Sequence, residues 1–154
     1  MYRIAHLALG LGVIRAALAV LGFVAALAGG AERGPAALGL AFGAGVTAIA
    51  LLSGRRWTLG RQPELHPLPD GIERRGLGDA IARGLLPSTA GVSVLLVIAL
   101  AFEPVLSAVL AGVLAGMVIA GLVSLSDLFM CEYRDGVLLY ADATDSSRRY
   151  AVPR

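Results

Sequence analysis

The stretch Ile4–Leu27, IAHLALGLGVIRAALAVLGFVAAL, decides the class of this chain. Over its 24 residues the only polar side chains are those of His6 and Arg15. At about 1.5 Å per residue, an α-helix of this length measures about 36 Å, which is enough to cross a hydrocarbon core of about 30 Å. The stretch therefore predicts a membrane-spanning helix that carries one cation.

Arg15 lies near the middle of this predicted helix. A charge at the centre of a bilayer costs about 2.5–3.5 kcal/mol on insertion scales, so we expect the guanidinium to face protein or water instead of lipid. Gly12, Ala19 and Gly22 share its helical face. A stripe of such small residues lets a second helix approach closely. The pattern predicts that Arg15 points into a seam between helices.

The whole chain follows the same apolar pattern. It has 154 residues, of which 57% are hydrophobic, and its mean hydropathy of +0.78 is too high for an ordinary soluble domain. The apolar residues fall into four blocks, which predicts an all-α integral membrane protein built as a four-helix bundle. We expect residues 1–127 to form this transmembrane domain, with helices at about 4–28, 35–53, 85–102 and 104–126 and a cytoplasmic loop at 54–84.

A cleaved signal peptide is the alternative reading of the first block. Ala26-Leu27-Ala28 fits a cleavage site, and Arg3 supplies a short basic start. However, the apolar stretch exceeds the usual length of about 7–15 residues, and Arg15 interrupts it. We therefore expect the block to be retained as a transmembrane helix.

The arginines predict the orientation in the membrane. All 13 basic residues are Arg, and eleven of them precede the first block, lie between the second and third, or follow the fourth. Only Arg33 lies on the opposite side. Because positive charge marks the cytoplasmic side, both termini should be cytoplasmic. The residue usage favours a bacterial inner membrane, with the lipid bilayer as a partner and no nucleic acid.

The C-terminal residues 128–154 predict a small cytoplasmic β-structure. Met130–Arg134 and Val137–Ala141 flank Asp135-Gly136, a dipeptide typical of two-residue hairpin turns. Arg148–Val152 is a third candidate strand. The expected result is a β-hairpin or a three-strand meander, and a partly disordered tail is the alternative.

Two further blocks also carry faces of small residues. Gly39 and Gly43 mark the second block, and Gly112 and Gly116 mark the fourth. Packing within one bundle is the simpler explanation, and a dimer seam at the fourth block is the alternative. The predicted helix–helix seam residues are Gly12, Ala19, Gly22, Gly39, Gly43, Gly112 and Gly116.

The chemistry-bearing residues indicate no reaction. The chain has no phosphate-binding loop, no serine-hydrolase elbow and no zinc-protease motif. Its two histidines lie in different segments, and Cys131 is the only cysteine. All carboxylates fall outside the apolar blocks, which disfavours a proton-coupled pump. We predict no catalytic residue, no metal and no cofactor.

Four hypotheses remain for Arg15. It donates to backbone carbonyls or to hydroxyls such as those of Thr47, Ser93 or Ser124, it pairs with an acid of another subunit, it reaches a lipid headgroup, or it binds a transported anion. The favoured function is a non-catalytic accessory, scaffold or self-associating membrane protein, as a homo-oligomer or with other membrane subunits. The main alternative is a small anion channel or transporter. A lipid-modifying enzyme using Asp127, Ser124 or His66 is the least favoured class.

Overall fold

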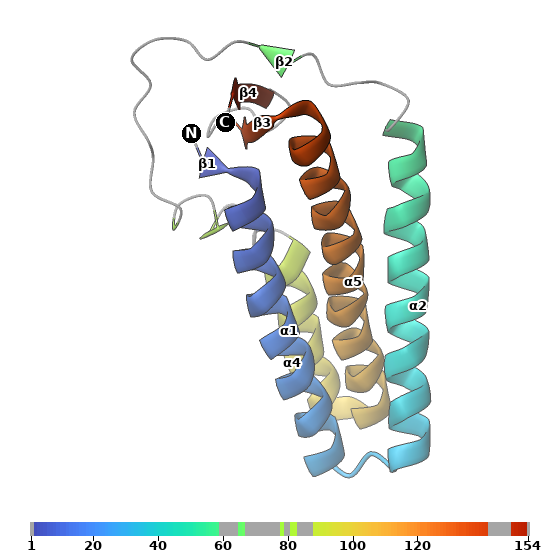
Figure 1. Ribbon diagram of the computed structural model, residues 1–154. Coiled ribbons are helices and arrows are strands. Elements are labelled where there is room, and N and C mark those ends of the chain that lie inside the picture. Colours follow the sequence, from blue (N-terminus) through green and yellow to red (C-terminus); the bar gives the residue numbers. More distant parts are fainter. Residues whose placement is uncertain are drawn as a thin grey trace.

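The computed structural model describes residues 2–58, 65–66, 78, 81–82, 88–141 and 149–153. Helices hold most of these residues, so the prediction of a mainly helical chain is confirmed. The helices are α1 (Ile4–Ala28), α2 (Arg33–Thr58), α4 (Ser88–Phe102) and α5 (Pro104–Asp135). They form one bundle, with the α1–α2 and α4–α5 connections at one end and both termini at the other (Figure 1).

Three of these helices are long and apolar enough to cross a membrane. They are Ile4–Ala28, Arg33–Ser53 and Pro104–Asp135, with 25, 21 and 32 residues. The sequence predicted a fourth spanning helix at about 85–102, but α4 has only 15 described residues. This described part is about 22 Å long, against about 30 Å for a hydrocarbon core. Residues 85–87 of that prediction lie outside the described residues.

Helix α5 is the centre of the bundle. It packs along α1, α2 and α4, whereas α1 and α2 have little contact with each other. Ala26, Ala36 and Ala108 bring α1, α2 and α5 together near the interhelical connections, and all three are fully buried. Away from that end α1 and α2 separate, and the second core cluster joins α1, α4 and α5 around Ala19, Leu96 and Leu114.

The end of α5 corrects the predicted hairpin. The sequence predicted that the helix ends at about 126 and that Met130–Arg134 is a strand, but α5 continues through these residues to Asp135. Gly136 follows with a φ of 64°, and its N–H donates to the Glu132 carbonyl. A left-handed glycine serves both hairpin turns and helix C-caps. Here the uninterrupted helix before it selects the cap.

A small sheet lies at the end of the bundle that holds the termini. Its strands are β1 (Tyr2–Arg3), β3 (Val137–Ala141), β4 (Arg149–Pro153) and β2 (Leu65–His66), in the order β1-β3-β4-β2. Strands β3 and β4 are antiparallel, with Leu139 opposite Ala151. Strand β1 takes the edge of β3 that the sequence assigned to Met130–Arg134. Most of the predicted loop 54–84 lies outside the described residues, and 54–58 belong to α2.

Candidate functional site

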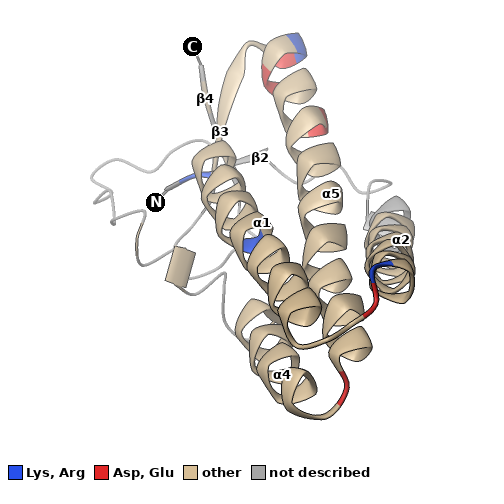
Figure 2. Cartoon of the chain, turned by 90° about the horizontal axis from the view of Figure 1, so that it is seen from below, with Lys and Arg blue, Asp and Glu red and all other residues tan. Residues whose placement is uncertain are grey.

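Arg15 joins the middle of α1 to the first turn of α4. Its Nε–H donates to the Thr89 hydroxyl over 2.8 Å, and Thr89 is buried at 1% exposure. This is the one hydrogen bond that Arg15 makes among the residues that the structure describes, and its side chain is half-buried. In Figure 2, α1 carries one blue band about midway along its length, and the red bands lie on α5 and on the connections between helices. The terminal nitrogens of the guanidinium therefore have no acceptor within the described ranges.

Thr89 is the second residue of α4, so this short helix begins beside the middle of α1. The first-turn N–H groups of a helix carry a partial positive charge. The hydrogen bond to Thr89 places the first described turn of α4 next to the Arg15 cation. Ile81, which precedes α4 in the chain, also lies beside α1, because its side chain is next to Gly10. The region thus combines two positive features at one depth.

The hydroxyls predicted as partners of Arg15 lie elsewhere. Ser93 donates to the Thr89 carbonyl over 2.9 Å, one turn below it on α4. Ser124 donates to the Ala120 carbonyl of its own helix over 2.8 Å. Thr47 lies against Gly116 on the opposite side of α5. Thr89, which the sequence reasoning missed, takes the role instead; its position in a Ser-Thr pair after Pro87 was the available signal.

The glycine faces meet inside the chain. A methyl group added at Gly43 would collide with the Val109 carbonyl, and one at Gly112 with the Leu40 carbonyl. Gly39 and Gly116 lie in the same α2–α5 contact. Helix α2 of the same chain therefore covers the face that the sequence offered as a dimer seam. These contacts require glycine because two backbones touch.

On α1, only part of the predicted small-residue face contacts another described helix. Ala19 is buried in the core cluster, and Gly22 lies against the Leu96 side chain of α4. Gly12 differs, because no described atom lies within 4 Å of a methyl group added there. The reason is that α4 begins at Ser88, so its described part runs beside the second half of α1.

An ion pair between Arg3 and the buried Glu132 joins the N-terminal strand to the end of α5. Glu132 has 0% exposure, and its carboxylate accepts from Arg3 Nη2 at 3.1 Å and from the Leu139 N–H at 2.9 Å. One acid thus joins β1, α5 and β3. Arg3 Nε is buried and lacks a partner among the described residues. The sequence reasoning missed this pair, although it placed both residues on the same side of the membrane.

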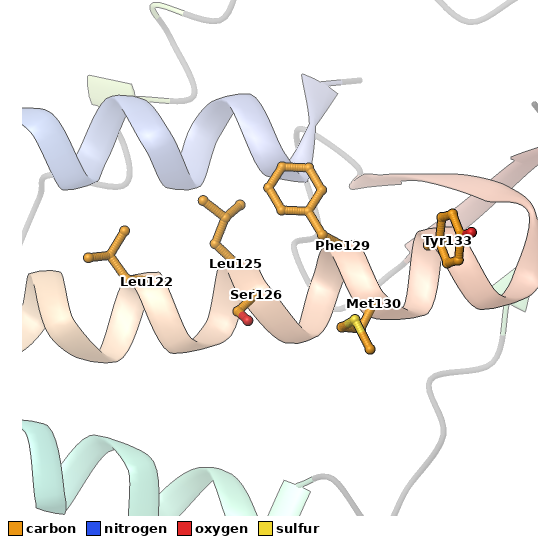
Figure 3. Close-up of a pocket in the computed structure, with 6 residues that line it drawn as sticks. All are labelled: Leu122, Leu125, Ser126, Phe129, Met130 and Tyr133. Carbon is orange, nitrogen blue, oxygen red and sulfur yellow. The ribbon is translucent and has the colours of Figure 1, made fainter.

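A shallow apolar groove lies on α5 where α1 and α2 separate. It is lined by Leu122, Leu125, Ser126, Phe129, Met130 and Tyr133 (Figure 3). Phe129 points toward the start of α1, and Met130 points away from it. Met130 and Tyr133 are 68% and 79% exposed. This is an open apolar surface next to the polar end of the bundle.

Comparison of the chain with protein-family models, with curated proteins and with solved structures finds no match. Within the described ranges, no three His, Cys, Asp or Glu side chains come together as a possible metal site. The function is therefore argued from the geometry of Arg15.

Proposed function

We propose that this chain is a multi-pass protein of the bacterial inner membrane with a non-catalytic accessory, scaffold or self-associating role. In this proposal α4 completes four membrane helices together with the segment before it. Both termini, residues 54–84 and the C-terminal β-strands lie on the cytoplasmic side. The arginine distribution supports this orientation because Arg33 alone lies on the other side.

The observation that carries the accessory role is the incomplete environment of Arg15. A guanidinium has five donors, and within the described part of the chain Arg15 uses one of them, toward Thr89. Its side chain reaches the surface of the bundle at mid-helix depth, where exposure to lipid costs about 2.5–3.5 kcal/mol or more. A carboxylate or carbonyl from another membrane subunit, or from a second copy, would complete this environment.

The test compares assembly of the wild-type protein with that of Arg15→Leu after extraction in a mild detergent. We expect the wild-type protein to elute as a complex, and the Arg15→Leu variant to elute predominantly as the single chain. Arg33→Leu is the matched control, because it removes an exposed arginine at the helix end. Equal assembly of the wild-type and Arg15→Leu proteins, or no assembly of either, would contradict the accessory role.

The orientation has a separate test. Cys131 is the only cysteine and is exposed at the end of α5. A membrane-impermeant maleimide should label it in inside-out vesicles and leave it unlabelled in intact spheroplasts. The reverse pattern would overturn the orientation.

A small anion channel or transporter is the second candidate. The observation in its favour is the start of α4 beside Arg15, because transporters direct the N-termini of broken helices at anionic substrates. This candidate predicts chloride or phosphate flux in liposomes that Arg15→Gln abolishes and Arg33→Gln leaves unchanged. Absence of flux from an assembled wild-type protein would remove it and leave the accessory role.

A further inference from the structure

We infer that the partner of Arg15 is a membrane helix of a different protein, which carries an aspartate or a glutamate near the middle of the bilayer. This inference rests on the proposed accessory role and narrows it, because it names the chemistry of the partner and leaves out a second copy of the chain. Three features lead to it: the hydrogen bond of Arg15, its depth in α1 and the positions of the carboxylates in the chain.

The bond to Thr89 occupies one edge of the Arg15 guanidinium. A guanidinium has two edges that can each hold a carboxylate through two parallel N–H donors, one formed by Nε and Nη2 and the other by Nη1 and Nη2. Nε donates to Thr89 over 2.8 Å, and the described residues offer no acceptor to Nη1 or Nη2. The edge formed by the two terminal nitrogens is therefore the one that a carboxylate can take.

The depth of Arg15 favours an acid on a membrane helix over a lipid headgroup. Arg15 is the twelfth of the 24 residues Ile4–Leu27, so in the proposed membrane placement its Cα lies near the midplane. Half of a hydrocarbon core is about 15 Å, which exceeds the reach of an arginine side chain. A neutral acceptor at this depth leaves the charge of the cation uncompensated, whereas a carboxylate cancels it.

A second copy of the chain has no acid at the matching depth of its predicted spans. All eleven carboxylates lie outside the four apolar blocks, which are Ile4–Leu27, Ala36–Leu52, Leu85–Phe102 and Val105–Leu125. Two copies in one bilayer, whether parallel or antiparallel, would therefore bring Arg15 next to apolar side chains or to another arginine. The complementary charge has to come from a different protein.

The surface of α1 next to Arg15 leaves room for a partner helix. Gly12 lies one turn before Arg15, and no described atom comes within 4 Å of a methyl group added there. The neighbouring Val13 is 69% exposed. Gly22 differs, because a methyl group added there would collide with the Leu96 side chain of α4. Among the described residues, α1 is thus more open at the level of Arg15 than in its second half.

The experiment places the full chain in liposomes and uses a synthetic membrane peptide as the probe. The peptide has about 20 apolar residues with one aspartate at its centre, and two sister peptides carry leucine or asparagine there. Resonance energy transfer from a label on the exposed Cys131 measures association. We expect the aspartate peptide to bind about tenfold more tightly than the leucine peptide, a factor equal to about 1.4 kcal/mol. The asparagine peptide should bind more weakly than the aspartate peptide, because it cannot neutralise the cation.

Variants of the chain locate the contact. Arg15→Leu should reduce binding of the aspartate peptide to the level of the leucine peptide. Arg15→Lys keeps the charge but loses the planar pair of donors, so it should retain only part of the binding. Arg33→Leu is the matched control, because Arg33 is exposed at the start of α2, and it should bind the aspartate peptide as the wild-type protein does.

Equal binding of the three peptides by the wild-type protein, or equal binding of the aspartate peptide by the wild-type and Arg15→Leu proteins, would overturn the inference. A detergent-extracted complex that contains only copies of this chain and depends on Arg15 would also overturn it, and would leave the self-associating role standing. Binding of the aspartate peptide by a wild-type protein that forms no complex of its own would instead contradict the proposed function.

Discussion

Helix α5 is held in two different ways on its two sides. Toward α2 the contact is built around glycines, and the backbones of Gly112 and Leu40 touch. Toward α1 and α4 larger side chains fill the core, and α1 is anchored by two arginine bonds, from Arg15 to Thr89 and from Arg3 to Glu132. The first side is complete within the chain. On the second side Arg15 makes a single hydrogen bond among the described residues, and the proposed function places the partner there.

The largest expected effect is on the α2 side. Gly112→Ala places a methyl group against the Leu40 carbonyl and the Ala44 nitrogen, which are backbone atoms that cannot rotate away. We expect the free energy of unfolding to fall by about 3 kcal/mol, the upper range for overpacking. Denaturation with sodium dodecyl sulfate in mixed micelles, followed by circular dichroism, measures this change.

Gly121→Ala is the control on the same helix, because no described atom lies within 4 Å of its added methyl group. It should be neutral or stabilising by up to about 1 kcal/mol, from the better helix propensity of alanine. Equal effects of the two substitutions would mean that α2 does not lie where the structure places it.

A smaller effect is expected at the buried ion pair. Glu132→Ala removes the acceptor of Arg3 and of the Leu139 N–H. We expect a loss of about 2 kcal/mol, because each lost bond is charge-assisted but Arg3 can still reach water. Asp135→Ala breaks an exposed pair with Arg134 on the same helix and should leave the free energy of unfolding nearly unchanged, because solvent screens such a pair. Amide hydrogen exchange at Leu139 should increase in the first variant only.

The smallest effect is expected at the Arg15 bond. Thr89→Val keeps the shape of the side chain and removes the acceptor, and polar contacts in membrane proteins contribute about 1 kcal/mol on average. Its measurement is a double-mutant cycle with Arg15→Leu in the same unfolding assay. If Thr89→Val costs as much in the Arg15→Leu background as in the wild-type chain, the bond contributes nothing to stability.

The sequence predicted the helices well where their ends are marked by local chemistry. Pro104 at the start of α5 and Gly29-Gly30 after α1 are such marks. It misplaced the end of α5 because Asp135-Gly136 suits a hairpin and a helix cap equally. At the candidate site, one of its four hypotheses gave Arg15 a hydroxyl partner, and it named Thr47, Ser93 and Ser124 as examples. The Ser-Thr pair after Pro87 was a signal for Thr89, but which hydroxyl meets Arg15 depends on how α4 lies beside α1.

The sequence by itself determined that the chain is helical and rich in apolar segments, since hydrophobicity and helix length are properties of each segment alone. The pairing of segments was decided only in the tertiary structure. Contact between Gly112 and α2, between Arg15 and Thr89, and between Glu132 and Arg3 joins residues far apart in the chain. Each small-residue face fits several neighbours equally well, so only the packed bundle selects one.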